Sequence, residues 1–447
     1  MHGAGELGTR MIFGWDPLWV STILFVATYA VVVSERVNRA IVAGLGAGLM
    51  VTTGVLNQQQ AVAGVDFNTL GLLTGMMVLV AITRRCGVFQ YVAIWSAKKV
   101  EARPWGILLM FSVVTAVFSA FLDNVTTVLL IAPITLLVTE ELKVNPYPYL
   151  FAEIFSSNIG GSATLIGDPP NIMIGSAVGL TFNDFLLNLA PIIPVIMLAT
   201  LFVIYLIWGR GLKASDEARH RIMQFREREA ITDARLMKQS LSVLALVVVG
   251  FIFAHPLHLE PATIAMFGAG LLLLITNLGR DAEEQTEDVH GSFGEVEWVT
   301  LFFFVGLFIV VAGIEHAGLL NMLANWVVDF TGGDMKITAL MILWVSAVAS
   351  AVVDNIPFVA TMIPMIESMA STFGGADNLE PLWWSLALGA CLGGNGSLVG
   401  ASANLIVAGF AERAGHRIRF LPFMLVAFPL MLLSIVIATF YIYFRYL

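Results

Sequence analysis

Two acidic–amide pairs interrupt long apolar stretches of the sequence. Asp123-Asn124 lies in the middle of residues 104–138, and Asp354-Asn355 lies in the middle of residues 337–371. An ionised carboxylate at bilayer depth costs on the order of 3 kcal/mol, so such a residue usually faces a pathway or a partner. We therefore expect Asp123, Asn124, Thr126, Asp354 and Asn355 to bind an ion or a hydroxylated solute, with a sodium ion at Asn124 and Asn355 as one form of the site. The alternative is that each aspartate reaches the aqueous boundary and caps the helix that follows.

Glycine-rich segments interrupt two further apolar regions, residues 147–180 and 381–410. Broken helices are tolerated at membrane depth where the freed backbone lines a cavity or is buried in protein. Glycine permits such turns, and hydroxyl or amide side chains beside it lie next to the exposed peptide groups, where both can contact a solute. These considerations add the following candidates to the site: Gly160, Gly161, Ser162, Thr164, Gly393, Gly394, Asn395 and Ser397.

The end of the first glycine-rich segment carries a third carboxylate. It reads Asp168-Pro169-Pro170-Asn171, whereas the corresponding residues of the second segment read Ala401-Ser402-Ala403-Asn404. Asp168 is therefore either a proton carrier or a cap before Asn171, and Asn171 and Asn404 join the candidate site.

The candidate site lies in segments without basic residues. Residues 104–142, 147–209 and 337–412 contain no Lys or Arg. We therefore expect an anionic site that suits a proton, a small cation or a neutral polyhydroxy solute better than a dianion.

Composition predicts a membrane protein. Of 447 residues, 58% are hydrophobic and 12% charged, and the mean hydropathy is +0.85. A soluble domain cannot bury that much apolar surface. A formal net charge of −9 without a basic stripe gives no reason to expect nucleic acid as a partner. Two cysteines, Cys86 and Cys391, cannot build a disulfide framework or a zinc site, and no nucleophile–base motif indicates an enzyme or a cofactor.

The predicted fold is an all-α membrane protein. Apolar stretches of spanning length, allowing for short or tilted spans, occur at residues 18–34, 39–56, 68–84, 184–208, 240–256, 262–278, 298–314 and 421–444. Residues 104–138 and 337–371 are expected to form re-entrant helical hairpins with polar tips. Residues 1–16 lack the pattern of a cleavable signal, so the first span is expected to remain as an anchor.

Basic residues predict the orientation. Lys and Arg near residues 36–39, 84–103, 209–238 and 413–419 fall on one side if the spans alternate and the hairpins return to their side of entry, which places that side in the cytoplasm and both termini outside. Residues 209–238 form a charged cytoplasmic linker between a first unit, 1–208, and a second unit, 239–447.

The two units repeat one pattern. A shift of 231 residues aligns Ser119 with Ser350 and Asp123-Asn124 with Asp354-Asn355, and a shift of 233 aligns Gly160-Gly161 with Gly393-Gly394. With its broken helix counted as a span, each unit has five spans and one hairpin, and an odd number of spans inverts the second copy. Inverted repeats with interrupted helices are typical of alternating-access carriers.

The run Ser119-Ala120-Phe121-Leu122-Asp123-Asn124-Val125-Thr126-Thr127 resembles the ion transporter superfamily, most closely the ArsB/NhaD-type permeases and the melanosomal P protein. The resemblance continues in residues 158–161 and 166–171 and covers essentially the whole chain. It implies a homodimer in which spans 18–56 and 240–278 form a scaffold and the hairpins and broken helices form a mobile, elevator-type transport domain. It also implies efflux of arsenite or antimonite, or exchange of sodium and protons. The superfamily's dicarboxylate carriers have a Ser-Asn-Thr motif at both tips, from which this chain departs.

Our hypothesis from the sequence is a proton-coupled antiporter that exports arsenite or antimonite across a bacterial-type inner membrane. Three alternatives stay open: a sodium/proton antiporter on the same residues, a carrier of dicarboxylates or other anions, and a passive channel. The coupling ion is H⁺ or Na⁺. Whether a separate ATPase docks on the cytoplasmic linker is left open.

Overall fold

A computed structural model describes residues 14–34 and 36–447, and the expectation for the amino terminus itself lies outside these residues. In the described residues regular structure is helical, which confirms the all-α class. Eight of these helices are long and apolar enough to cross a membrane. The protein is therefore a multi-pass integral membrane protein.

The first half runs from α1 to the linker. Its elements are α1 (Pro17–Ser34), α2 (Arg39–Thr52), α3 (Gln58–Ala63), α4 (Phe67–Arg84), α5 (Val88–Lys99), α6 (Pro104–Phe121), α7 (Asn124–Leu142), α8 (Tyr147–Gly161), α9 (Pro169–Val178), α10 (Phe182–Asn188), α11 (Ile193–Ile204) and the π-helix η2 (Tyr205–Gly209). The last three cover the expected span 184–208, which bends by 54° between α10 and α11.

The linker and the second half follow. The elements are α12 (Asp216–Met223), η3 (Glu227–Ala230), α13 (Ala234–Ile252), α14 (Ala254–Leu257), α15 (Pro261–Asn277), α16 (Ala282–Gly294), α17 (Trp298–His316), α18 (Leu319–Thr331), α19 (Met335–Val352), α20 (Asn355–Glu367), η4 (Ala376–Leu379), α21 (Glu380–Gly393), η5 (Gly394–Gly396), α22 (Ser402–Arg413) and α23 (Phe420–Tyr446).

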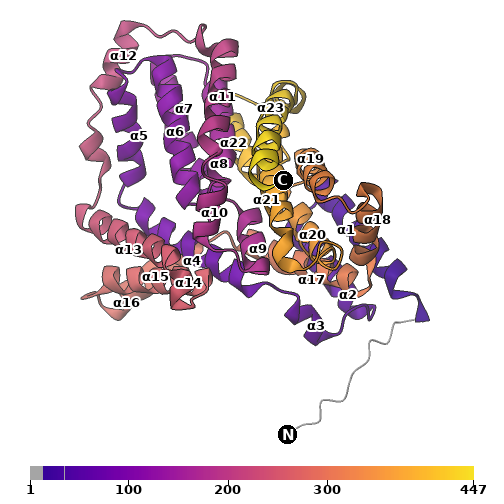
Figure 1. Ribbon diagram of the computed structural model, residues 1–447. Helices are drawn as coiled ribbons and strands as arrows, with labels where there is room; N and C mark the ends of the chain where they lie inside the picture. The colour runs from indigo at the N-terminus through magenta and orange to yellow at the C-terminus, as the bar shows by residue number, and fades with distance from the viewer. Residues whose placement is uncertain (1–13, 35) are drawn as a thin grey trace.

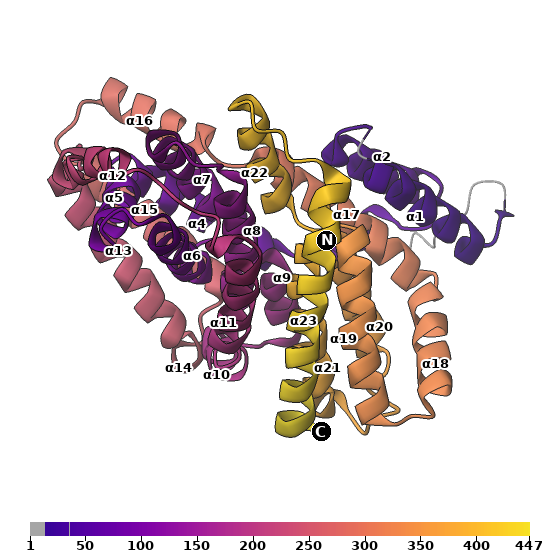
Figure 2. The same cartoon turned by 90° about the horizontal axis from the view of Figure 1, so that it is seen from above.

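Six helices form a row along one side of the molecule. Contacts connect them in the order α1, α2, α17, α4, α15 and α13, and Figure 1 shows this row along the lower part of the view. Two groups of long helices lie above the row in this view (Figure 1). One group contains α6 and α8, and the other contains α19, α21 and α23. Figure 2 shows the same two groups from above, with α9 and α22 between them.

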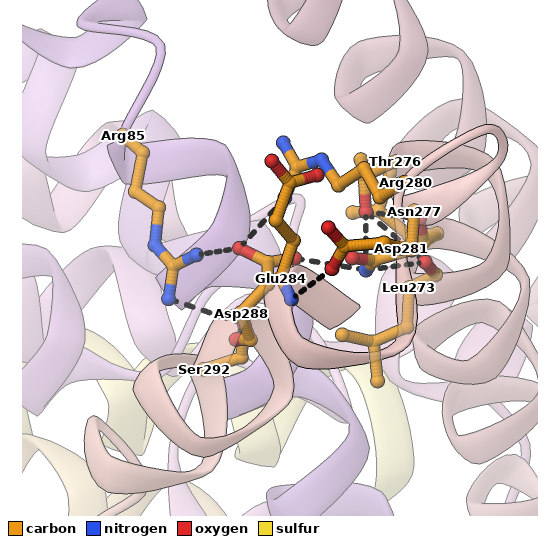
Figure 3. A network of polar contacts seen from close by, with 10 residues as sticks. Arg85, Leu273, Thr276, Asn277, Arg280, Asp281, Glu284, Asp288 and Ser292 are labelled. Carbon is orange, nitrogen blue, oxygen red and sulfur yellow. Dashed lines mark hydrogen bonds and ion pairs between the residues drawn. The ribbon is translucent and has the colours of Figure 1, made fainter. Parts of the chain in front are cut away.

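The charged segments dock on one another at the linker side, by which we mean the side of the molecule that carries residues 210–233. Lys98 Nζ lies 2.6 Å from Glu227 Oε2, and Thr232 N donates to Cys86 O. The acidic helix α16 is held nearby by Asp288, whose Oδ1 lies 2.6 Å from Arg85 Nη1 and whose Oδ2 accepts from Asn277 (Figure 3). Two acidic residues of the region 281–297, Asp288 and Glu295, thus pair with Arg85 and Arg84 of the first half.

Candidate functional site

Four helices begin at the centre of the molecule. The hairpin helices α7 and α20 start at Asn124 and Asn355, and the broken helices resume as α9 and α22 at Pro169 and Ser402. Contacts join α20 to α9 and α22 to α7, so each hairpin packs against the broken helix of the other half of the chain. Four helix amino termini therefore aim their partial positive charges at one region.

Asp168 occupies the middle of this region and is fully buried. Its Oδ1 accepts from Asn124 Nδ2 at 3.2 Å and from Asn355 Nδ2 at 3.3 Å. Among the described residues no Lys, Arg or His forms an ion pair with Asp168. The hydrogen-bond partners of the carboxylate are thus uncharged, namely the amides of the two hairpin tips and the thiol of Cys391, an arrangement suited to binding a proton or a small cation.

A cluster of asparagines lies next to Asp168. Asn158 Nδ2 donates to Asn395 Oδ1 and to Asn404 Oδ1, both at 3.0 Å, and Asn158 Oδ1 accepts from Asn124 Nδ2 at 3.3 Å. In the part of the chain that the structure describes, the buried Asn395 Nδ2 has no partner. Asn158 joins the first glycine-rich segment to the second, although the residue was not among the candidates. Its counterpart at a shift of 233 is Cys391, so a search for matching polar pairs passes over it.

Asp123 and Asp354 have different surroundings. Asp123 Oδ1 accepts from Thr126 N at 2.8 Å and its Oδ2 from Thr126 Oγ1 at 2.5 Å, so Asp123 and Thr126 together cap α7. Asp354 Oδ1 accepts from Ile356 N at 3.1 Å, which caps α20. Both aspartates therefore take the capping role that was left open, and both lie at the tips beside Asp168.

Arg39 corrects the expectation that the site has no positive charge. Its Nη1 donates to Asp354 Oδ2 at 3.0 Å and to Ser402 Oγ at 2.6 Å, while Nη2 donates to Thr300 Oγ1 at 3.2 Å. The guanidinium also lies 5.0 Å from the centroid of the Phe303 ring. Arg39 begins α2, far from the polar segments in sequence, so counting basic residues within those segments could not find it.

The predicted glycines and hydroxyls shape the backbone around the site. A Cβ on Gly160 would collide with the backbone of Ala116, and one on Gly393 with the backbone of Ala347. Thr164 Oγ1 donates to Ala120 O and Ser397 Oγ to Ala351 O, at 2.5 and 2.6 Å. These four contacts match in the register of the sequence alignment.

The remaining predicted residues stabilise the two helix breaks by hydrogen bonds across them. Asn171 Nδ2 donates to Thr164 O, and Asn404 Nδ2 donates to Ser397 O, both at 2.9 Å. Ser162 Oγ donates to Asn158 O, and the carbonyl oxygens of Gly161 and Gly394 accept from Asn171 and Asn404. Their side chains and carbonyls are therefore used for the fold, and their contribution to the site is the shape of its wall.

Two cavities meet at Arg39. A narrow one of about 20 Å³, enough for a single water molecule or a bare ion, is lined by Asp123, Asn124, Asp168, Asn355 and Arg39 among others. A wide one of about 570 Å³ contains Arg39, Glu297, Thr300, Asp354, Ser402 and Arg413. Within residues 14–34 and 36–447 no group of three His, Cys, Asp or Glu side chains is arranged to hold a metal ion.

Comparison with known proteins adds a family. Residues 29–389 match the model of the CitMHS family, described as "Citrate transporter". An uncharacterized transporter of Mycobacterium tuberculosis is 42% identical over 432 residues, covering 96% of this chain and 98% of that one. The P protein of Homo sapiens is 31% identical over 504 residues, which cover 95% of this chain but 59% of the P protein. The crystal structure of the Alcanivorax borkumensis YdaH transporter shares the fold, with a TM-score of 0.58 at 15% identity over 95% of this chain and 98% of that one.

Proposed function

Because the chain belongs to the CitMHS family of secondary transporters, within the ion transporter superfamily, we propose that it is a proton-coupled antiporter whose coupling ion binds at Asp168. One observation carries this proposal. Asp168 is buried between the two hairpin tips, and its side-chain hydrogen-bond partners are uncharged, two amides and the Cys391 thiol. A carboxylate in such a place gains most by taking up a proton or a small cation, and it loses that ligand when the tips separate.

Sodium is the alternative coupling ion. Asn124 and Asn355 present amides to Asp168, and rotation of either amide about its last bond exchanges the nitrogen for an oxygen. Two amide oxygens, the carboxylate and the narrow cavity would then form an oxygen-lined cation site. Proton and sodium occupancy would use the same residues.

For the exported solute we retain arsenite or antimonite. Trivalent arsenic is a neutral hydroxide near neutral pH and requires no basic ligand, and the buried amide cluster around Asn158 offers donors and acceptors to hydroxyl groups. Cys391 Sγ lies 3.5 Å from Asn171 Oδ1 at the edge of this cluster. A single thiol is a soft ligand for arsenic, and the amides would supply the other contacts.

Arg39 favours a second candidate, a carrier of carboxylate anions. The guanidinium lies in the wide cavity, and the family description refers to citrate. An anion with several carboxylates could displace Asp354 from Arg39 and bind the guanidinium in two-point fashion. In this version Asp168 still supplies the coupling site.

The mechanism we propose is alternating access of the elevator type. The matched contacts at Gly160 and Gly393, and at Thr164 and Ser397, support two inverted copies of one unit. The hairpins and broken helices would move as one body against the row of α1, α2, α17, α4, α15 and α13. The same proposal includes a homodimer, a cytoplasmic linker, both termini outside and a place in the inner membrane. It also includes an ATPase that docks on the linker.

The experiment that tests this function measures proton movement in proteoliposomes that enclose a pH-sensitive dye. Arsenite, sodium or citrate is added outside in turn, with chloride salts as controls. The antiporter predicts proton movement on addition of one of the three, saturable and abolished by a proton ionophore. Ohmic conductance without countertransport would instead identify a channel.

A further inference from the structure

Glu153 is a carboxyl group that the proposed site does not use. It lies in α8, its residue is 1% exposed, and its Oε1 accepts from Thr135 Oγ1 of α7. Its Oε2 is buried and has no hydrogen-bond partner among the described residues. A buried carboxyl oxygen without a donor is rare and calls for a ligand.

The groups around Glu153 offer no counter-charge. The helices packed against α8 include α6, α7, α11, α21 and α22. Of these, α6 and α11 contain no titratable side chain. The titratable groups on or capping the other three are Asp123, Glu140, Glu141, Lys143, Glu380, Cys391, Glu412 and Arg413. Lys143 and Arg413 are the two cations among them; both are exposed, and Arg413 is stacked on Phe410.

A charged Glu153 would therefore be buried beside more negative groups than positive ones. Burial without a partner disfavours the ionised form strongly, whereas the neutral acid can accept from Thr135 through one oxygen. A neutral acid also supplies a hydrogen that can turn toward an acceptor.

Hydroxyl groups lie on both sides of Glu153. On the linker side, Thr139 is one turn beyond Thr135 in α7, and its Oγ1 donates to Thr135 O at 2.8 Å. Toward the centre, Ser157 is one turn of α8, or about 6 Å, from Glu153. Ser157 Oγ donates to Asn124 O at 3.1 Å.

Three more hydroxyls in the same helices are buried and unpaired in the described part of the chain. They are Ser112 and Thr115 of α6 and Thr127 of α7. Together with Glu153 of α8, these unsatisfied polar groups in three packed helices could hydrogen-bond to a transferred proton or to a water molecule.

We propose that Glu153 is a second proton-binding site of the transporter, which stores a proton between the linker side and the Asp168 site. The proton arrives from water at the linker side, binds the Glu153 carboxylate, and passes over the hydroxyls near Ser157 to Asp168. Both acids lie in the first half. At the matching positions of the second half stand Leu386 and Ala401, which carry no acid. The two halves thus divide their tasks, and the first carries the protons. This inference rests on the proposed function for its transport role, but the binding of a proton by Glu153 can be tested without transport.

The test is infrared difference spectroscopy on the purified full-length protein. The stretching band of a protonated carboxyl group is compared between wild type, Glu153→Gln and Glu140→Gln. Glu153→Gln preserves the shape and the contact with Thr135, and Glu140 is an exposed glutamate at the linker-side end of α7, so it serves as the matched control. We expect Glu153→Gln to lose one buried carboxyl band and Glu140→Gln to keep it.

A second variant keeps the test decisive if Glu153→Gln does not fold. Thr135→Val removes the hydroxyl that Glu153 accepts from, so the band should move to higher frequency, and Thr135→Ser should restore its position. An unchanged spectrum in both Glu153→Gln and Thr135→Val would overturn the proposal. A band that disappears on addition of sodium chloride at constant pH would also overturn it, in favour of a sodium site.

Transport separates this inference from the proposed function. In proteoliposomes, Glu153→Gln should slow proton movement at least tenfold and flatten its dependence on pH, while Glu140→Gln keeps the wild-type rate. If wild type moves no protons but still shows the Glu153 band, the antiporter proposal fails and the proton site stands. If Glu153→Gln transports protons at the wild-type rate with the wild-type pH profile, the storage role is wrong.

Discussion

Arg39 Nη1 lies 3.0 Å from Asp354 Oδ2, although 315 positions separate the two residues in the chain. This ion pair joins α2 of the helix row to the tip of the second hairpin. The side chains are 27% and 15% exposed, so the pair is partly shielded from water and less screened by salt than an ordinary surface pair. In an elevator mechanism it must break whenever the hairpin moves along the row.

Removal of Arg39 tests that link. Arg39→Gln leaves Asp354 without its counter-ion, and we expect a loss of about 1–3 kcal/mol, below the value for a fully buried pair because both side chains keep some contact with water. Thermal melting in detergent would measure it, with Arg36→Gln, at an exposed loop position, as the control. Arg39→Gln combined with Asp354→Asn should recover part of the loss, and a double variant less stable than either single one would contradict the pairing.

Asn158 is expected to hold the two broken helices together. Asn158→Ala removes the donor to Asn395 and Asn404 and leaves their buried oxygens short of a partner. We expect a loss of about 1–3 kcal/mol and slower transport. Asn321→Ala, at an exposed position of α18, should leave both melting temperature and transport unchanged. Wild-type behaviour of Asn158→Ala would show that the asparagine cluster is unimportant.

Gly160 allows close approach of α8 to α6. In Gly160→Ala the new methyl group would meet the backbone of Ala116, which cannot move aside as a side chain can. We expect a destabilisation of about 1–3 kcal/mol. Gly409→Ala is the matched control, because nothing lies within 4 Å of a Cβ there, and it should stabilise α22 by about 0.5–1 kcal/mol. Equal melting temperatures for the two alanine variants would refute the steric argument.

The linker should loosen at acid pH. The hydrogen bond from Lys98, aided by its charge, holds the pKa of Glu227 below its ordinary value of 4.5. A carboxyl whose pKa falls on folding stabilises the folded linker above its unfolded pKa, and this contribution is lost as the pH falls through the lowered value. Pepsin should therefore cut the linker faster in Lys98→Met than in wild type near pH 5, with the difference vanishing at lower pH. A difference that grows on acidification would contradict the sign of this effect.

Helix breaks were the most predictable feature. Asp123 and Asp354 accept hydrogen bonds from the first turns of α7 and α20, so the interruption seen in the apolar pattern coincides with a helix start. The contacts of Thr164 and Ser397 follow the same alignment because paired hydroxyls had been kept at equivalent positions. Polar residues within apolar stretches and the internal repeat were sufficient to predict these elements.

Arg39 and Asn158 belong to the candidate site but could not be predicted from the sequence. Arg39 acts through tertiary packing of α2 against the second hairpin, and a basic residue near a span end is equally typical of a cytoplasmic loop. Asn158 has Cys391 as its counterpart, so similarity between the halves did not single it out. The helices α5 and α18 were also missed, since neither is long or apolar enough to predict a span.

The central claim is that Asp168 carries the coupling ion, and one comparison tests it most directly. Asp168→Asn and Asp377→Asn, the latter at an exposed position of η4, are reconstituted side by side and proton movement is followed after addition of the solute that drives wild type. Asp168→Asn removes a buried charge, so it should melt at or above the wild-type temperature while losing coupled proton movement at least a hundredfold. Asp377→Asn should match wild type in both. Proton movement at the wild-type rate in folded Asp168→Asn would contradict the claim.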